Sequence, residues 1–548
     1  MTPDLMINAD AALAPRLCAQ PSDIFDAARI DAAIAAAVAQ DISETSVRNE
    51  TVKILRAAQT KGRAAIAEAF TAAPFDAAAM TASYTYLTDG MVKSVLNVIT
   101  THLHPAPHNA PPLSAIGVGG YGRGEMAPFS DVDLLFLLPA SITPWASSVI
   151  EAALYILWDL KLKVGHSSRT IRDCVQLGHE DYTIQTALLE HRFVWGDTDL
   201  AEQLSEALKH DLFSGSGAAF IEAKLEERDN RHIKQGQRYV VEPNVKEGKG
   251  GLRDLQSLFW IAKYIHGAEH SADLVAAGVF REDEYETFKE AENFLWAVRG
   301  HLHLLTGRTT EQLTFDMQVS VAEAMGYTDF KGRRAVEVFM QAYFRHATAV
   351  GDLTRIFLTK LEDMHVKSEP LLERLFRRRP RIKDGYEVVH NRIAITDDTI
   401  FLSDPLNLLR LFEEALRTGM LIHPDAMRTV KANLHLIDDT LRHTPEAQRI
   451  FLDLLLKHGN PERALRRMNE LGVLAAFIPE FEPIVAMMQF NMYHSYTVDE
   501  HTIQTIAHLA MIEKSELEEE LPVASSILKR GVNRKVLYVA LLLHDIGK

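Results

Sequence analysis

The chain has 548 residues, of which 47% are hydrophobic and 24% charged, a composition typical of a globular protein with three or four domains. The formal net charge of −16 argues against a broad nucleic-acid surface, although it leaves room for a local basic pocket. Cys18 and Cys174 are the two cysteines, and the sequence shows neither a membrane-length apolar run nor a signal-peptide pattern. We therefore expect a reduced, cytoplasmic protein that has no membrane partner.

The first hundred residues are predicted to be helical. Residues 26–39 are rich in alanine, residues 49–104 follow helical periods, and the proline-rich stretch 101–113 ends this pattern. Short apolar runs and one helical stretch then alternate over the segments 114–118, 131–138, 146–162 and 163–170. This order predicts strands separated by a helix, and hence a sheet with helices packed on it.

The rest of the chain reads as mainly helical, so the predicted fold class is α+β, mostly helical, with a mixed sheet. The basic stretch 375–385 is interpreted as a solvated linker rather than a phosphate-binding patch, and residues 386–402 as a short hairpin. The predicted regions are an N-terminal helical segment (1–60), the sheet domain (61–217), a helical domain (218–370), a connecting region (371–480) and a C-terminal helical domain (481–548).

One stretch, "GVGGYGRGEMAPFSDVDLLFLL" at 117–138, carries the clearest chemistry. Glycines after a strand can turn sharply and bring backbone N–H groups close to a phosphate. Asp131 and Asp133 are two residues apart, so on a strand both carboxylates face the same side. Their mutual repulsion is relieved by a divalent cation, and Mg²⁺ prefers such oxygen ligands. Either feature alone is more often a plain turn or a solvated edge, whereas the combination favours a nucleotide–metal site.

The same stretch resembles the nucleotidyltransferase superfamily of DNA polymerase beta. The string "GGYGRGEMAPFSDVDLLFL" is similar to the bacterial bifunctional uridylyltransferase/uridylyl-removing family, which modifies the PII nitrogen-regulatory protein. "VEPNVKEGKGGLRDLQSLFWIAK" (241–263) and "MQFNMYHSYTVDEHTI" (488–503) resemble two further segments of that family in the same order. The resemblance covers roughly residues 50–548.

The resemblance implies transfer of UMP from UTP to a tyrosine of PII, with Asp131 and Asp133 as catalytic ligands of Mg²⁺ or Mn²⁺. The implied nucleotide-binding residues are Gly119, Gly120, Arg123, Lys246, Lys249 and Arg253. A third catalytic carboxylate is usual in the superfamily, but the stretch "KLKVGHSSRT" offers none. Asp173 and Glu190 are nearby candidates, and the role is left unassigned.

The segment 244–256 places three basic residues among glycines just before an apolar helix. A basic, glycine-rich helix start suits an anionic ligand, whereas its plainer reading is a flexible loop. With the resemblance, contact with the nucleotide is favoured. Asp254 is expected either to cap the helix or to pair with Arg253, and the sequence does not decide between these.

The C-terminal stretch "LLLHDIGK" contains the adjacent pair His544 and Asp545. With His501 upstream, this order resembles an HD phosphohydrolase metal site, and His494 is expected to be structural or to face the substrate. The sequence stops right after the pair, before the distal aspartate and the glutamine-binding domains of the family. We therefore expect an incomplete HD domain that neither removes uridylyl groups nor senses glutamine by itself.

Two rival functions remain from the sequence. CCA-adding RNA nucleotidyltransferases also join such a domain to an HD domain, but the acidic charge and missing basic stripe disfavour nucleic acid. A non-catalytic nucleotide-binding regulator is the second rival, because the third carboxylate is missing. Nucleotide preference, oligomeric state and regulatory ligand are not determined by the sequence.

Overall fold

The computed structural model describes residues 17–41, 43–235, 240–267, 272–365, 381–490, 496–529 and 531–547. The chain divides into two compact units, Met1–Gln235 with Asn244–Tyr327, and Gly236–Pro243 with Thr328–Lys548. The predicted helical domain, 218–370, therefore lies partly in each unit. Most of the predicted linker 375–385 lies outside the described residues.

Within the described residues, no helix combines the length and the apolarity that crossing a bilayer requires.

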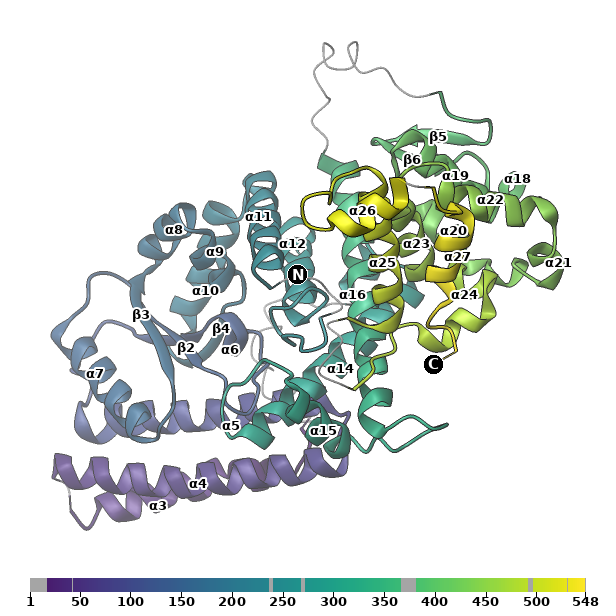
Figure 1. Ribbon diagram of the computed structural model, residues 1–548. Coiled ribbons are helices and arrows are strands. Elements are labelled where there is room, and N and C mark those ends of the chain that lie inside the picture. The colour runs from purple at the N-terminus through teal and green to yellow at the C-terminus, as the bar shows by residue number, and fades with distance from the viewer. Residues whose placement is uncertain are drawn as a thin grey trace. The chain divides into compact units, whose positions relative to one another are not determined.

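The first unit contains a four-stranded mixed sheet and most of the long helices (Figure 1). Its elements are α2 (Pro21–Ile24), α3 (Ala27–Val38), α4 (Glu44–Ala72), α5 (Ala77–Val98), η2 (Ile99–Leu103), β1 (Ser114–Gly117), α6 (Gly119–Gly122), β2 (Val132–Leu138), α7 (Pro144–Asp159), β3 (Val164–Thr170), α8 (Ile171–Glu180), α9 (Tyr182–Leu189), β4 (Arg192–Gly196), α10 (Thr198–Ala207), η3 (Leu208–Leu212), α11 (Gly217–Gln235), α12 (Leu252–His266), α13 (Asp273–Ala276), α14 (Glu282–Thr306) and α15 (Phe315–Ala324).

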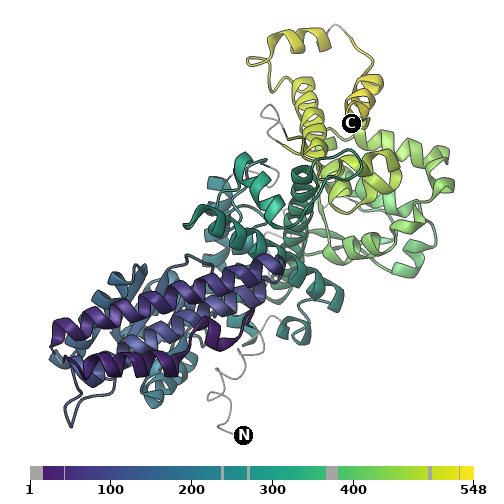
Figure 2. The same ribbon diagram turned by 90° about the horizontal axis from the view of Figure 1, so that it is seen from below.

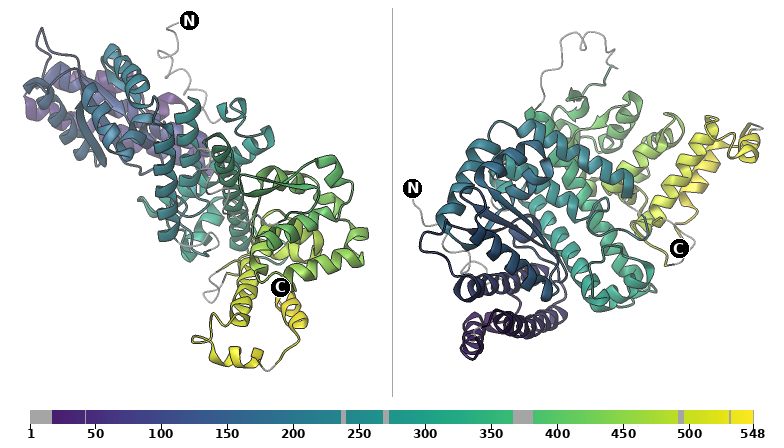
Figure 3. Two further views of the ribbon diagram at one scale, coloured as in Figure 1. Left: turned by 90° about the horizontal axis from the view of Figure 1, so that it is seen from above. Right: turned by 90° about the vertical axis from the view of Figure 1, so that its left-hand side faces the viewer.

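The strand order is β3-β2-β1-β4, with β2 antiparallel to β1 and parallel to β3. Leu135 and Leu137 of β2 pack with Leu204 and other residues of α8–α10 and η3, so the alternate residues Leu134 and Phe136 face the opposite layer. Figure 3 (right) shows the sheet between helices on both sides. Burial on both faces explains why β2 reads as a continuous apolar run.

Two long helices, α4 and α5, support the second face of the sheet. α4 packs against α3 and α5 (Figure 2). α5 in turn packs against α7 and β4. The N-terminal turns of several helices are capped by side-chain oxygens; Asp76 accepts from Ala79 N, and Thr143 accepts from Ala146 N. The predicted helices and strands of this region are confirmed to within a few residues, while β4 was not predicted.

The second unit is helical apart from a small three-stranded sheet of order β5-β6-β7. Its elements are α16 (Ala335–His365), β5 (Tyr386–Val389), β6 (Arg392–Ile395), α18 (Asp398–Leu402), α19 (Asn407–Thr418), β7 (Leu421–Ile422), α20 (Pro424–Ala432), η4 (Leu434–Leu436), α21 (Asp439–Arg442), α22 (Pro445–Leu456), α23 (Pro461–Glu470), α24 (Val473–Phe477), η5 (Pro479–Ile484), α25 (Val498–Glu513), α26 (Pro522–Lys529) and α27 (Arg534–Leu543). Strands β5 and β6 form the predicted hairpin.

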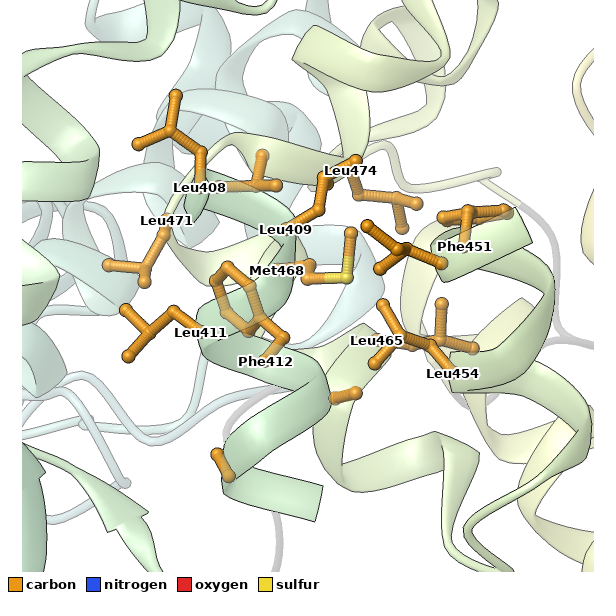
Figure 4. Close-up of a cluster of buried hydrophobic side chains, with 14 of the residues drawn as sticks. Leu408, Leu409, Leu411, Phe412, Phe451, Leu454, Leu465, Met468, Leu471 and Leu474 are labelled. Carbon is orange, nitrogen blue, oxygen red and sulfur yellow. The ribbon is translucent and has the colours of Figure 1, made fainter. Parts of the chain in front are cut away.

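Leucine, phenylalanine and methionine side chains from α19, α22 and α23 build the core of the second unit (Figure 4). Phe412 of α19, Leu454 of α22 and Leu465 of α23 are each 1% exposed or less. Tyr538 and Leu542 of α27 belong to the same cluster, as does Ile503 of α25. This shared core fixes the two helices that carry the C-terminal histidines.

Candidate active site

A glycine turn links β1 to β2 through the short helix α6. Gly119 has φ +59°, a conformation that L side chains rarely adopt, so the predicted sharp turn occurs at this residue. Within the described chain, the N–H groups of Gly119 and Gly120 make no backbone hydrogen bond. Gly122 packs so closely on the C-terminal end of α9 that a Cβ at position 122 would lie 1.8 Å from the carbonyl oxygen of Glu190. The N–H groups of Gly119 and Gly120 are therefore available as hydrogen-bond donors, and the close packing of Gly122 holds the turn in place.

The two aspartates lie at the start of β2, beside the turn. Asp131 immediately precedes the strand, and Asp133 is its second residue. A Cβ at Gly119 would lie 3.5 Å from Asp133 Oδ2, so backbone and carboxylate are neighbours. Burial raises the pKa of Asp133, the charge of Asp131 raises it further, and Lys246 opposes both effects. A divalent cation held by these oxygens would relieve the repulsion, so the residues present fit the Mg²⁺ that the sequence predicts.

Both aspartates line a cleft of about 450 Å³ in the first unit. Seven of the eight sequence-predicted residues of the transferase site lie around it: Gly119, Gly120, Arg123, Asp131, Asp133, Lys246 and Arg253. The eighth, Lys249, is exposed and does not line the cleft. The structure thus brings together residues that are more than 100 positions apart.

Arg123 is enclosed by carboxylates. Its Nε donates to Glu125 Oε2 at 2.9 Å, and its Nη1 forms a short ion pair with Glu190, whose side chain is 1% exposed. Burial opposes the charge of Arg123, but the two glutamates outweigh it and raise the pKa of the guanidinium. Because these partners occupy Nε and Nη1, the geometry favours a role in holding Glu190 and α6 over direct contact with a nucleotide.

Asp173 and Glu190, the two candidates for the third catalytic carboxylate, are both engaged in other contacts. Asp173 forms the capping box of α8 with Thr170, with Thr170 N to Asp173 Oδ2 at 3.0 Å, and is solvent-exposed. Glu190 lines the cleft but is held by Arg123. Within the described residues, a single group of three or more histidine, cysteine or acidic side chains places its ligand atoms within metal-binding reach. That group lies outside this cleft. The role remains unassigned.

The glycine-rich segment before α12 is a hydrogen-bonded loop. Asn244 Oδ1 accepts from the backbone N–H groups of Lys246 (3.1 Å) and Glu247 (2.7 Å). Asp254 accepts from Gly250 N at 2.8 Å and pairs with Arg231 and His232. Neither sequence alternative holds among the described residues, because the N-cap of α12 is Gly251 without a side-chain cap and Asp254 pairs with Arg231 and His232 rather than with Arg253.

Arg253, in contrast, bonds to Glu247 through Nε and Nη2, at 3.3 and 3.1 Å. Together with Lys246, it places a positive charge on one wall of the cleft. This arrangement agrees with the predicted anion-binding role of the segment.

The cleft residues that the sequence reasoning missed include Lys224, Trp260, Arg299 and Glu311. Lys224 Nζ lies 5.3 Å from the centre of the Trp260 ring, and the Arg253 guanidinium lies 5.2 Å from it on the same helix, α12. These residues sit within ordinary amphipathic helices or connecting segments and form no local motif. Only their convergence in the folded chain identifies them.

A second cluster lies in the other unit and matches the predicted HD residues. His501 on α25, His544 after α27 and Asp545 each offer a ligand atom, and these atoms all lie within 4.8 Å of one another. His544 Nδ1 bonds to Leu541 O at 2.6 Å, which orients the ring. Residues 491–495 of the preceding motif, including His494, lie outside the described residues. These three side chains are of the types that would hold a transition metal.

Family models match three parts of the chain. The model described as GlnD PII-uridylyltransferase matches residues 219–358, and that of the uridylyltransferase GlnD third domain matches residues 386–477. A model of glutamate-ammonia ligase adenylyltransferase matches residues 1–157, the part that holds the glycine turn and both aspartates.

Curated proteins extend the match along the chain. The bifunctional uridylyltransferase/uridylyl-removing enzyme of Ruegeria pomeroyi is 68% identical over 527 residues, which is 96% of this chain and 58% of that protein. This chain is homologous, over nearly its whole length, to bifunctional uridylyltransferase/uridylyl-removing enzymes.

Two further curated proteins with the same name also match most of the chain. The enzyme of Cereibacter sphaeroides is 61% identical and that of Azospirillum brasilense 48% identical, over 96% and 84% of this chain. The chain spans 57% and 50% of these two relatives. It thus spans between 50% and 58% of the length of these three curated relatives.

Proposed function

We propose that the chain transfers UMP from UTP to a tyrosine hydroxyl of the PII signal protein and releases pyrophosphate. The observation that carries the proposal is the cleft in which Asp131 and Asp133 adjoin the glycine turn at Gly119, in a chain homologous to uridylyltransferases. The reaction forms a bond between the tyrosine oxygen and the α-phosphorus and breaks the bond to the β-phosphate oxygen. The electron pair leaves with pyrophosphate, and the tyrosine proton passes to solvent.

The residues of the cleft suit this chemistry. Asp131 and Asp133 would hold Mg²⁺ or Mn²⁺, which supplies charge stabilisation at the transferred phosphoryl group. The N–H groups of Gly119 and Gly120 would bind phosphate oxygens, and the positive wall formed by Lys246 and Arg253 would attract the polyanion. Arg123 would keep the base of the turn fixed through Glu190.

The test is incubation of the protein with UTP, Mg²⁺ and the PII protein of the same organism, followed by intact-mass measurement. We expect PII to gain the mass of one UMP per modified site and pyrophosphate to appear in equal amount. Unmodified PII in the presence of bound UTP would support the non-catalytic regulator instead. Nucleotide addition to tRNA under the same conditions would support the RNA-modifying alternative.

A second activity is supported by His501, His544 and Asp545. In the full-length enzyme, we propose, this cluster binds the metal that activates water for hydrolysis of uridylyl-PII. The supporting observation is the mutual reach of the three ligand atoms in the second unit. The relatives' names include a uridylyl-removing activity, which agrees with this assignment. Glutamine control of either activity, and hence a role in nitrogen signalling in the cytoplasm, belongs to the same proposal.

A further inference from the structure

Lys246 forms a weaker ion pair than the other basic side chains of the cleft. Its Nζ lies 4.0 Å from Glu247 Oε1 and makes no hydrogen bond within the described residues. By comparison, Lys224 lies 2.6 Å from Glu227, and Arg253 lies 3.1 Å from Glu247. The charge of Lys246 is therefore the least compensated among these basic side chains.

Arg299 on α14 is the second cation of interest, and it is held by one carboxylate. Its Nε lies 3.1 and 3.0 Å from the two oxygens of Glu311, and its Nη2 lies 2.7 Å from Oε1. This two-point contact fixes the plane of the guanidinium, while Nη1 makes no hydrogen bond in the described chain. Arg299 lines the cleft and is 6% exposed. The unused amino group of a fixed guanidinium is a ready donor for an anion.

Glu311 connects these two cations. Its side chain holds Arg299, while its backbone carbonyl accepts from Val245 N, next to Lys246, at 2.8 Å. Burial opposes ionisation of Glu311, but contacts with His303 and Arg299 outweigh it and lower its pKa to about 2. The carboxylate is therefore charged throughout the physiological range. A single residue thus orders Arg299 through its side chain and the Lys246 loop through its backbone.

We propose that Lys246 and Arg299, both positioned by Glu311, bind the two phosphates of UTP that leave as pyrophosphate. The inference rests on the proposed transfer reaction. Both side chains line the cleft that holds Asp131 and Asp133, and Glu311 bonds to Arg299 and to the N–H of Val245, next to Lys246. A position in the same cleft as the proposed metal ligands places them where negative charge accumulates as the leaving group departs.

The first experiment measures binding without turnover. Titration calorimetry in Mg²⁺ would compare pyrophosphate with UMP for the wild type, Lys246→Gln and the double variant Arg299→Gln with Glu311→Gln. The double variant removes both charges of the buried pair and keeps its shape, which limits the cost to folding. Lys289→Gln, at an exposed position of α14 outside the cleft, is the matched control.

We expect pyrophosphate affinity to fall by about tenfold or more in both cleft variants, with UMP affinity changed by less than about twofold. Unchanged pyrophosphate affinity in a variant with wild-type circular dichroism would overturn the inference. So would an equal loss of affinity for UMP, which would place these cations at the nucleoside side of the site.

The single variant Glu311→Gln tests the positioning role. It leaves both cations in place but loosens the guanidinium, so we expect a raised KM for UTP and weaker pyrophosphate inhibition; Lys289→Gln should show neither. A variant with wild-type KM and inhibition would refute positioning by Glu311. If the wild-type protein transfers no UMP, the proposed function fails, while the calorimetric comparison still decides whether the subsite exists.

Discussion

Gly165 on β3 lies directly opposite Asp133 on β2, and a Cβ at position 165 would lie 2.4 Å from Asp133 Oδ1. A Cβ atom essentially never lies within 3.0 Å of another heavy atom, so even one methyl group would push the carboxylate aside. The missing side chain therefore leaves Asp133 free to turn toward the cleft. A feature of the edge strand β3 thus controls the geometry of the proposed metal site.

The first prediction follows from this contact. Gly165→Ala should reduce nucleotidyl transfer by about tenfold or more, because a displaced metal ligand is costly even when the shift is about 1 Å. The rate with UTP and PII would be compared with that of Gly217→Ala, a glycine whose added methyl would meet nothing within 4 Å. Equal rates for the two variants would show that Asp133 moves without functional cost.

The two glycines of the turn should respond differently to substitution. Gly119 has φ +59°, whereas a Cβ at Gly120 would find its nearest atom, Arg123 Nη2, at 3.6 Å. Gly119→Ala should therefore lower both thermal stability and UTP binding, while Gly120→Ala should retain the fold. Thermal melting and UTP titration of both variants would measure this.

The larger variant Gly120→Val is also expected to weaken UTP use, because a branched side chain would obstruct phosphate approach to the backbone N–H. Kinetics for UTP in this variant that match the wild type would show that the N–H of Gly120 does not contact phosphate.

The aspartate pair should be required for catalysis but not for folding. Asp131→Asn together with Asp133→Asn removes the proposed metal ligands and should lower the transfer rate by roughly 10³-fold or more. Because the change also removes repulsion between the two charges, we expect thermal stability without metal to be unchanged or higher. Circular dichroism, melting and the PII mass assay would be measured together. Near-normal transfer in a folded double variant would rule out this metal site.

Glu292 on α14 gives a pH prediction. Burial raises its pKa to about 8, the nearby Glu125 adds to the rise, and Arg123 opposes it. A carboxyl with a raised pKa favours the protonated form when folded, so its contribution to stability is present at low pH. That contribution is lost as the pH rises from the ordinary range, about 4.3, through 8.

Glu292→Gln should remove this loss, so the advantage of the variant over the wild type should be clearly larger at pH 9 than at pH 6. Urea unfolding at both pH values would give the difference in free energy of unfolding. Glu290→Gln, at an exposed position of the same helix, is the control. A stability difference that does not depend on pH would contradict the assignment to Glu292.

The histidine cluster of the second unit should bind a divalent transition metal. His544→Ala removes one of three ligands and should weaken Mn²⁺ or Zn²⁺ binding by about tenfold or more. The comparison is His508→Ala, an exposed histidine on α25, the helix that also carries His501. Metal titration of the two variants, followed by calorimetry, would test the cluster without an activity assay. The same affinity in both would show that His544 is not a ligand.

Local sequence determined much of the fold and the centre of the site. The apolar run of β2, the turn glycines and the Asp131–Asp133 spacing follow from strand periodicity and backbone sterics, which act over a few residues. The hairpin β5–β6 and the C-terminal trio His501, His544 and Asp545 were likewise predicted from the sequence. The strand β4 was missed because its five residues carry no alternation strong enough to distinguish them.

Which charged side chains form ion pairs was decided only by the tertiary structure. Glu190 pairs with Arg123, 67 positions away, and Asp254 pairs with Arg231 and His232. Arg299 and Glu311 reach the cleft from α14 and the segment after it, although no motif marks either residue. Ion pairs and cleft walls are set by the packing of helices distant in the chain, and their energies depend on burial that a sequence does not display. The residues that would hold the metal, and Lys246 among those that would bind phosphate, were therefore evident from the sequence, whereas Arg299 and Glu311 required the folded chain.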